Sequence, residues 1–189
     1  AVRCIDLANR RIEVEAGVVN LEVTRRVRDA GLSYAPDPSS QAACTIGGNI
    51  ANGSPIGDTP PVLIALGARL HLRRGLEERV LPLEDFFVSY GKQDRRKGEL
   101  IVAISVPRLR EPLQLRCYKI SKRFDSDITA VLGAFNVETG DGRVSSARIA
   151  YGGMAGVPKR AKALEGMLIG KAWSLETIEG ALPALDADF

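Results

Sequence analysis

The sequence predicts an α+β protein, and three features of its residue pattern support this fold class. The segment at 11–16 (RIEVEA) alternates apolar and charged side chains, which is the pattern of a half-buried strand. Three further strand candidates, at 115–121, 130–138 and 144–151, follow one another closely, which favours an antiparallel sheet. After residue 158 the apolar spacing becomes helical, so strands and helices occupy separate stretches of the chain.

The first part of the chain contains several further elements. A helix is expected from Asn20 to Gly31, because Asn20 is a good N-cap and the apolar residues that follow share one helical stripe. A short helical turn is expected at 61–66. The segments at 68–73 and 78–81 predict a hairpin around Gly75, and 99–106 predicts a buried strand closed by Pro107.

The second part begins after a charged, proline-containing connector at 108–112, which we interpret as a domain boundary. TGDG at 139–142 predicts a tight hairpin, since Asp-Gly tolerates positive φ. One helix is expected up to Gly170 and another after the cap Ser174. Three antiparallel strands covered by two helices would form a small α+β domain.

Composition excludes several classes of function. Of 189 residues, 45% are apolar and 26% are charged, and the 26 basic and 23 acidic residues are interspersed, which argues against nucleic-acid binding. No apolar run is long enough to cross a bilayer, and residues 1–11 do not resemble a signal peptide, so we expect a cytoplasmic protein. Three scattered cysteines predict reduced thiols and no metal site.

The segment at 34–61 is rich in Pro, Gly, Ser, Asn and Asp and has almost no periodicity, which favours a ligand-binding loop. Its centre is TIGGNI at 45–50, followed by NGSP at 52–55 and by Gly57-Asp58. Paired glycines allow a ligand to approach the backbone, and successive N–H groups form a nest for phosphate oxygens. The segment is neither a P-loop nor a dinucleotide fingerprint, since GGN is not expected to open a helix after a strand. A tight structural turn with hydroxyl caps is the alternative.

Several motifs resemble the flavoprotein of the molybdenum hydroxylases, in particular the small subunit of xanthine dehydrogenase. The segment at 45–61 is similar to that family's second FAD-contacting loop, and the similarity continues in the same order through five further motifs: LPLEDFF (81–87), YGKQDRR (90–96), YKISKRFDSDI (118–128), GAFNV (133–137) and ARIAYGGMAGVPKRA (147–161). Residues 11–44, by contrast, resemble the flavin subunit of glycolate oxidase, so the chain has the character of a hybrid of two related families.

This resemblance implies the domain organisation. Residues 1–108 would be the second subdomain of a PCMH-type FAD-binding domain, and 109–189 a truncated domain like the C-terminal domain of the CO dehydrogenase flavoprotein. The family has an earlier subdomain with its own glycine-rich loop, which nothing before Arg11 can supply, so the FAD-binding domain is expected to be partial.

The resemblance also implies roles for individual residues. The pyrophosphate of FAD and its surroundings would be held by the 45–54 segment, through Thr45, Gly47, Gly48, Asn49 and Asn52, and Ile46 and Ser54 would also bind the cofactor. Asp58 would bind the sugar-like hydroxyl groups of the cofactor. Ile101 would lie near the isoalloxazine ring, with core packing as the alternative. Lys119 would lie close to the ring and stabilise the negative charge of reduced flavin, with a solvated strand lysine as the alternative.

The function implied by the resemblance is electron relay. Electrons would pass from a molybdenum-cofactor large subunit through iron–sulfur clusters to FAD and then to NAD, in a complex of purine catabolism. No catalytic acid or nucleophile is expected in this chain, and the lone His71 is expected to be structural. A glycolate-type 2-hydroxy-acid dehydrogenase and a non-catalytic assembly module are the alternatives. The run 122–127 is either a surface ion-pair network or a contact to flavin or to a second subunit, and self-association is also expected.

Overall fold

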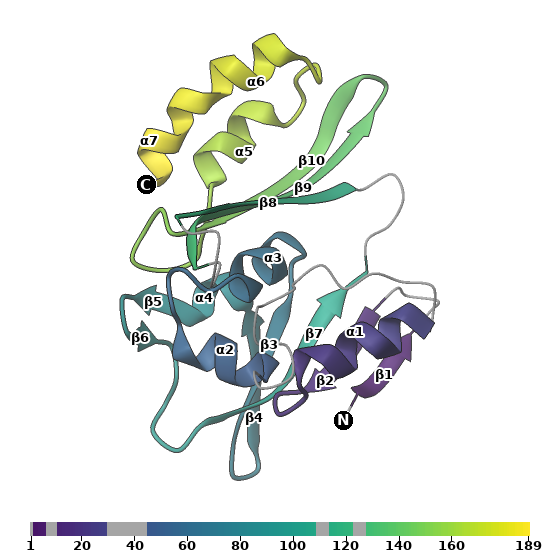
Figure 1. Ribbon diagram of the computed structural model, residues 1–189, viewed down its shortest axis with the longest axis vertical. Coiled ribbons are helices and arrows are strands. Elements are labelled where there is room, and N and C mark those ends of the chain that lie inside the picture. The colour runs from purple at the N-terminus through teal and green to yellow at the C-terminus, as the bar shows by residue number, and fades with distance from the viewer. Residues whose placement is uncertain (1, 7–10, 30–44, 109–113, 123–127) are drawn as a thin grey trace.

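The computed structural model describes residues 2–6, 11–29, 45–108, 114–122 and 128–189. In this part of the chain two β-sheets form separate layers, with a short helix (residues 59–65) between them, further helices against the first sheet and another group of helices on the far side of the second (Figure 1). The predicted α+β class is confirmed.

The first sheet is antiparallel and has five strands. They are β1 (Val2–Asp6), β2 (Arg11–Glu15), β3 (Arg69–Arg74), β4 (Glu77–Pro82) and β7 (Leu100–Pro107). Their order is β1-β2-β7-β3-β4. The central strand β7 pairs with β2 on one side and with β3 on the other. The expected strand at 11–16, the expected hairpin around Gly75 and the expected strand at 99–106 are all present.

The second sheet has one strand more than the sequence predicts. Its long strands are β8 (Gln114–Ser121), β9 (Thr129–Gly140) and β10 (Arg143–Gly152), and the additional strand is β11 (Lys159–Arg160). The prediction of three strands missed β11 because two residues are too few to show any periodicity. Asp141 and Gly142 have φ values of 51° and 72°, which confirms the tight hairpin at 139–142.

Three helices pack on the core side of the first sheet: α1 (Asn20–Asp29), α2 (Ile46–Asn52) and α3 (Thr59–Ala65). A helical turn, α4 (Leu83–Phe86), leads into a small hairpin of β5 (Phe87–Ser89) and β6 (Lys92–Gln93). The longest of the described helices is α1, with ten residues. No helix in the described ranges has the length and apolar character needed to span a membrane.

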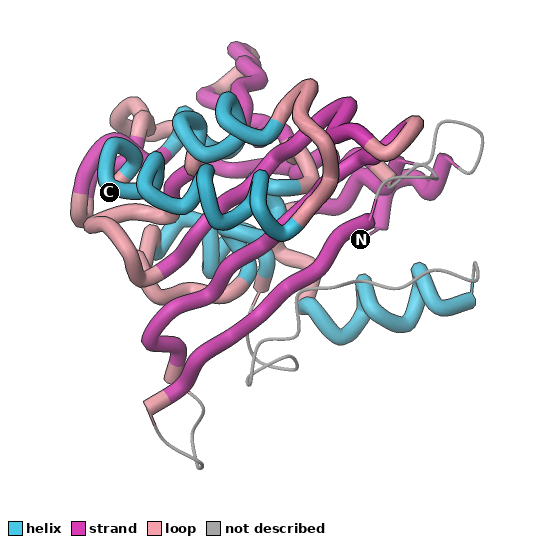
Figure 2. Tube along the Cα trace, turned by 90° about the horizontal axis from the view of Figure 1, so that it is seen from above, coloured by secondary structure: helices cyan, strands magenta, loops and turns pink. Residues whose placement is uncertain are grey.

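The outer face of the second sheet is covered by the C-terminal helices: α5 (Lys162–Leu168), α6 (Leu175–Ala181), η1 (Leu182–Ala184) and α7 (Leu185–Asp188). Figure 2, viewed from above, shows these helices lying across the long strands. Ala161, Leu164 and Leu168 are buried there, as the helical spacing predicts. Ser174 caps α6 as expected, and Asp188 accepts hydrogen bonds from two amide groups in the first turn of α5.

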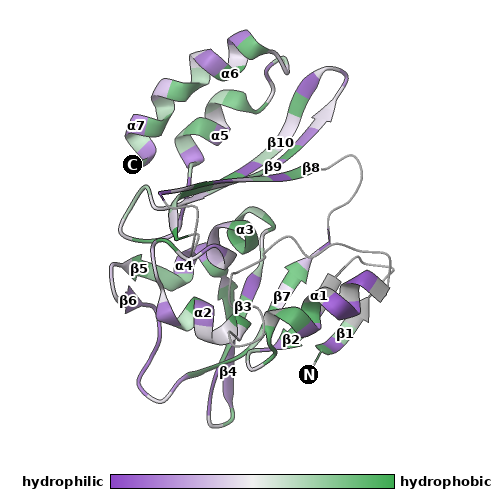
Figure 3. Ribbon diagram, viewed as in Figure 1, coloured by the Kyte–Doolittle hydropathy of each residue, from purple (hydrophilic) through white to green (hydrophobic). Residues whose placement is uncertain are grey.

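Helix α3 lies between the two sheets and belongs to the cores of both. All seven of its residues are buried, including its two N-terminal prolines. Val62 and Leu63 join one apolar cluster that includes Leu70 of β3 as well as Leu132 and Ala134 of β9. Figure 3 shows apolar residues on α3 and on β7, and buried residues of both elements belong to this cluster.

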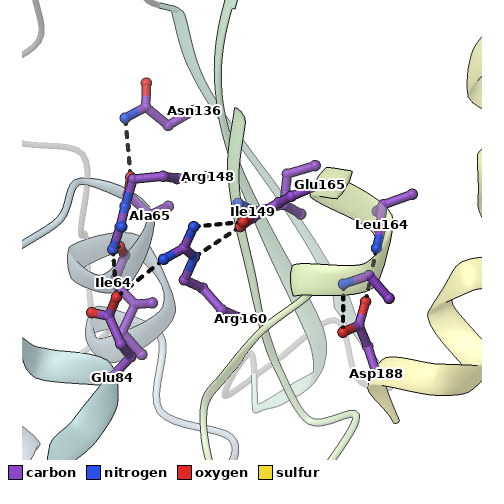
Figure 4. A network of polar contacts seen from close by, with 11 residues as sticks. Ile64, Ala65, Glu84, Asn136, Arg148, Ile149, Arg160, Leu164, Glu165 and Asp188 are labelled. Atoms are coloured by element: carbon purple, nitrogen blue, oxygen red, sulfur yellow. Dashed lines mark hydrogen bonds and ion pairs between the residues drawn. The ribbon is translucent and has the colours of Figure 1, made fainter. Parts of the chain in front are cut away.

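A polar network joins the C-terminal end of α3 to the second sheet (Figure 4). Asn136 Nδ2 donates to the carbonyl of Ala65 at 3.0 Å, and Arg148 Nη2 donates to the carbonyl of Ile64 at 2.9 Å. The first bond satisfies a carbonyl group that the helix leaves without an intrahelical partner, and the second adds to the hydrogen bond that the Ile64 carbonyl accepts from Gly67 N at 2.9 Å. Arg148 also reaches Glu84 of α4 at 2.8 Å, so the second sheet is fixed to two helices of the first layer.

Arg160 extends this network to α5. Its guanidinium donates to both carboxylate oxygens of Glu165, at 2.9 and 2.5 Å, and reaches Glu84 at 3.4 Å. Glu165 also accepts a hydrogen bond from the backbone amide of Ile149 at 2.7 Å. Two carboxylates on opposite sides of the second sheet therefore share one cation.

Candidate functional site

The TIGGN motif begins a helix, which corrects the expectation that GGN would not do so. Helix α2 starts at Ile46, and Thr45 is its N-cap, with a side-chain oxygen that accepts a hydrogen bond from Gly48 N at 3.0 Å. The helix ends at Gly53, whose φ of 61° gives a left-handed C-cap. The part of the 34–61 segment that the structure describes is thus two short helices, α2 and α3, joined by a tight connection; residues 34–44 lie outside the described ranges.

The backbone amides at the start of α2 are already hydrogen-bonded within the protein. Gly47 N donates to the carbonyl of Ala16 at 2.9 Å, and Ile46 N donates to that of Val18 at 3.2 Å. Because the amide of Gly48 is held by Thr45, these N–H groups do not form the open phosphate nest that the sequence suggests. The hydroxyl-capped turn, given above as the alternative, describes Thr45 correctly.

Replacing Gly47 with alanine is expected to lower the free energy of unfolding by about 1–3 kcal/mol, the usual cost of overpacking. A Cβ atom at this position would lie 2.4 Å from Ala16 Cβ and 2.7 Å from the Ala16 carbonyl oxygen, so the backbone would have to move. Gly17→Ala is the matched control, since its Cβ would meet nothing within 4 Å. Urea unfolding followed by circular dichroism measures both variants, and equal stabilities would contradict this role of Gly47.

The remaining residues of the 45–54 segment differ in exposure. Gly48 and Asn52 are exposed, Thr45 and Ser54 are half-buried, and Ile46 is only 2% exposed and belongs to the core. Asn49 is half-buried, but its Oδ1 atom is fully buried and has no hydrogen-bond partner among the described residues. A buried amide oxygen without a partner is costly in free energy, so this atom is suited to accept a hydrogen bond from a ligand.

Asp58 and Lys119, which are 61 positions apart, meet in an ion pair. Lys119 Nζ donates to Asp58 Oδ2 at 2.7 Å, and the two side chains are only 23% and 14% exposed. Thr129 donates its hydroxyl to the other oxygen, Oδ1. Asp58 also immediately precedes α3, so its carboxylate links the 45–58 segment to strands β8 and β9 of the second sheet.

Ile101 lies elsewhere in the fold, on the central strand β7. It is half-buried, pairs with Leu72 of β3 and packs against the large apolar cluster. Core packing, the alternative given above, therefore accounts for its position, and its proximity to a flavin ring stays a prediction. Of the 122–127 run, only the exposed Lys122 lies in the described part of the chain.

His71 lies on the face of the first sheet that points away from α2 and α3. Its Nε2 atom is 2.5 Å from Ser105 Oγ, at a shallow groove of about 270 Å³ whose lining also includes Arg69 and Val80. Neither residue of this pair is among the predicted site residues. In the described ranges no group of three or more His, Cys, Asp or Glu side chains gathers in a way that could hold a metal ion.

Thr129 is the residue at this site that the sequence did not reveal. Its side chain reaches Asp58 only because of the pairing between β8 and β9, which no local pattern encodes. Asn136 and Arg148, which hold the other end of α3, were missed for the same reason. The short polar side chains of α2 and of the residues just after it, joined to a partly buried Asp–Lys pair, are suited to hold a polar, partly anionic organic cofactor.

Two family models match the chain. The FAD-binding domain in molybdopterin dehydrogenase matches residues 3–109, and the CO dehydrogenase flavoprotein C-terminal domain matches residues 116–189. The chain therefore belongs to the flavoprotein family of the molybdenum hydroxylases, which confirms the resemblance described above. The first of these matches also covers the segment at 11–44, so this segment belongs to the same FAD-binding domain match as the rest.

Individual relatives agree with this family. The chain is 35% identical to nicotinate hydroxylase hnxS of Emericella nidulans over 182 residues, which is 94% of this chain and 13% of that protein. It is 36% identical to xanthine dehydrogenase 1 of Arabidopsis thaliana over 160 residues, which is 82% of this chain and 12% of that protein. The chain therefore spans about an eighth of the length of these curated relatives.

Solved structures match the whole described fold. A chain of the carbon monoxide dehydrogenase from Hydrogenophaga pseudoflava aligns with a TM-score of 0.85 and 26% identity, over 99% of this chain and 67% of that one. Quinoline 2-oxidoreductase from Pseudomonas putida 86 aligns with a TM-score of 0.75 and 20% identity, over 95% of this chain and 65% of that one. The architecture expected from the resemblance is thus confirmed.

The residues of the site fit FAD. Asn49 Oδ1 is a buried acceptor with no partner in the described part of the chain, and the exposed Gly48 leaves room for a bulky group. Asp58 uses two of the roughly four acceptor positions of a carboxylate, so it can still accept hydrogen bonds from cofactor hydroxyl groups. Lys119 places a cation beside Asp58, which suits a group that carries phosphates.

Proposed function

We propose that this chain forms one side of the FAD site in a xanthine dehydrogenase-like oxidoreductase. Residues 1–108 act as a PCMH-type FAD-binding unit, and residues 109–189 act as the flavoprotein C-terminal domain. The family match to an FAD-binding domain supports the cofactor. The single observation that carries the proposal is the Asp58–Lys119 ion pair, which joins the two matched regions beside the TIGGN segment.

In this proposal each residue of the site has a separate task. Asn52 and Ser54 donate hydrogen bonds to the phosphate side of the cofactor, and Asn49 Oδ1 accepts a hydrogen bond from one of its hydroxyl groups. Asp58 accepts hydrogen bonds from hydroxyl groups. Lys119 balances the negative charge of the flavin end. Bound FAD supplies the ability to take up two electrons and pass them on, while these residues orient the cofactor and set its electrostatic environment.

The wider complex is also part of the proposal. A molybdenum-cofactor subunit and iron–sulfur clusters deliver electrons to the flavin, and NAD receives them, as the relatives named xanthine dehydrogenase suggest. Purine is the substrate class by the same argument, and its chemistry takes place outside this chain. The exposed Cys4 and Cys117 are free thiols, which is typical of a reducing compartment and favours the cytoplasm.

FAD titration of the purified chain tests the site, and Asn49→Ala is expected to weaken binding about tenfold, equivalent to ~1.4 kcal/mol. The variant should be at least as stable as the parent, because alanine is the better helix former at a position within α2. Gln114→Ala removes an exposed amide at the far end of β8 and serves as the control. Quenching of flavin fluorescence measures the affinities.

Two outcomes would contradict the proposal. If the folded parent chain shows no saturable FAD binding and no rise in melting temperature with FAD, it does not form a usable site. If the parent binds FAD and Asn49→Ala binds it equally well, the cofactor lies elsewhere in the chain.

A further inference from the structure

Thr129 reaches Asp58 because of an irregularity in the pairing of β8 with β9. Lys119 pairs with Leu132 and Ile120 with Val131, but Ser121 pairs with Thr129, so Ala130 is left as an extra residue in β9. Such a bulge reverses the alternation of side chains between the two faces of a sheet. Thr129 therefore lies on the same face as Lys119, toward α3, whereas regular pairing would turn it to the opposite face.

The bulge is fixed by close packing against the end of β10. Gly153 has a φ of 87°, and a Cβ atom there would lie 2.0 Å from the carbonyl oxygen of Ala130. The amide of Gly153 donates to the carbonyl of Pro55 at 2.7 Å, within the segment that precedes Asp58. The bulge in β9 and the 53–58 connection are thus held against the same glycine, so the position of Thr129 relative to Asp58 is determined by backbone contacts.

Burial separates the role of Thr129 from that of its neighbours. Thr129 is only 5% exposed, while the side chains of Asp58 and Lys119 are 14% and 23% exposed. Thr129 has no surface to offer a ligand, and its hydroxyl bonds to Oδ1, the carboxylate oxygen that Lys119 does not use. With one oxygen held by each residue, the carboxylate cannot rotate about its terminal bond without losing a hydrogen bond.

We propose that Thr129 is a positioning residue of the FAD site, which fixes the carboxylate of Asp58 so that Oδ2 holds Lys119 and both groups face the cofactor. This inference rests on the proposed function and extends it to a residue of the second sheet. The C-terminal domain accordingly supplies Lys119 directly and sets the orientation of Asp58 through Thr129.

The test compares Thr129→Val, which keeps the shape but removes the donor, with Thr129→Ser, which keeps the donor. FAD affinity should fall about tenfold in Thr129→Val and stay within about twofold of the parent in Thr129→Ser, since hydrogen bonds to charged groups have effects of this size. In a Lys119→Met background, Thr129→Val should weaken FAD binding by less than about threefold, because the two residues act through one carboxylate. Melting temperatures of the cofactor-free proteins report folding separately.

The outcomes distinguish this inference from the proposed function. If the parent chain fails to bind FAD, both are overturned. If the parent binds FAD and Thr129→Val binds it equally well, only the role of Thr129 is overturned. The role of Thr129 is also overturned if Thr129→Ser loses as much affinity as Thr129→Val, because Thr129 would then act by packing alone. Fully additive effects of Thr129→Val and Lys119→Met on affinity would lead to the same conclusion.

Discussion

An Arg160→Met variant is expected to lose about 3 kcal/mol of unfolding free energy, the largest effect on stability that we predict. Arg160 is the shared partner of Glu165, whose side chain is 5% exposed, and of Glu84, whose side chain is 13% exposed. Removing one partner of a buried ion pair leaves an uncompensated charge, which typically costs 3–5 kcal/mol. The loss should lie at the low end of that range, because Glu165 keeps the amide of Ile149 and Glu84 keeps Arg148.

The controls for this variant come from the same sheet. Arg116→Met makes the same substitution at an exposed arginine that bonds only to its own neighbours among the described residues, and it should change stability by less than about 0.5 kcal/mol. Adding Glu165→Gln to Arg160→Met should recover part of the loss, because a neutral amide can still accept from Ile149. Urea unfolding measures all of these variants, and an Arg160→Met variant as stable as the parent would contradict the model of a shared buried cation.

The network also predicts a pH dependence. Burial raises the pKa of Glu84, but the hydrogen bond from Arg148 and the charges of both arginines outweigh it, so this pKa lies below its ordinary value. A carboxyl group of this kind stabilises the fold above the ordinary pKa of glutamate, and the contribution is lost as the pH falls through the lowered value. The destabilisation caused by Arg160→Met should therefore shrink under acidic conditions, where Glu84 is protonated.

Lys119→Met is expected to weaken FAD binding about tenfold and to lower the midpoint potential of bound flavin by about 30 mV, equivalent to ~1.4 kcal/mol for a two-electron couple. The cation stabilises negative charge, and that charge is greater on reduced flavin than on oxidised flavin. Its loss also leaves the partly buried Asp58 with Thr129 as its remaining partner among the hydrogen bonds described above. The affinity and the potential should fall together, because the positive charge of Lys119 favours both the binding of an anionic cofactor and the reduced form of its flavin.

Lys171→Met is the matched control for this second variant, because it removes the same charge at an exposed turn of the C-terminal helices. Affinity is measured by flavin fluorescence, and potential by equilibration with reference dyes. An unchanged potential in a Lys119→Met protein that still binds FAD would place Lys119 away from the ring. Equal effects of the two variants would mean that only overall charge matters.

Much of the architecture follows from local patterns in the sequence. Strands at 11–16, 99–106 and 130–138 were predictable because alternation or apolar runs identify half-buried or buried strands. The hairpin at 139–142 and the cap at Ser174 were predictable because each depends on a few neighbouring residues. Helix α2 was not, since IGGNIAN contains two glycines and only two large apolar residues, Ile46 and Ile50; its formation depends on Thr45 and on a turn at Ala16.

The candidate site was predictable only in part, because its geometry depends on pairing between distant segments. The sequence identified Asp58 and Lys119 separately, but not the ion pair that joins them. Thr129 could not be identified, because a one-residue bulge decides which face of the sheet it occupies. The assignment of the individual residues to parts of FAD stays a prediction until the titrations are made.

Helix α3 limits how the two matched regions of the chain can diverge during evolution. A break at residue 108 would separate two stretches of sequence, but α3, encoded in the first stretch, is packed against the strands of the second. A relative that acquired a different C-terminal sheet by recombination would inherit an α3 fitted to the old one. Substitutions on α3 and on the inner residues of β9 and β10 should therefore be selected together, so that the two domains evolve as one unit.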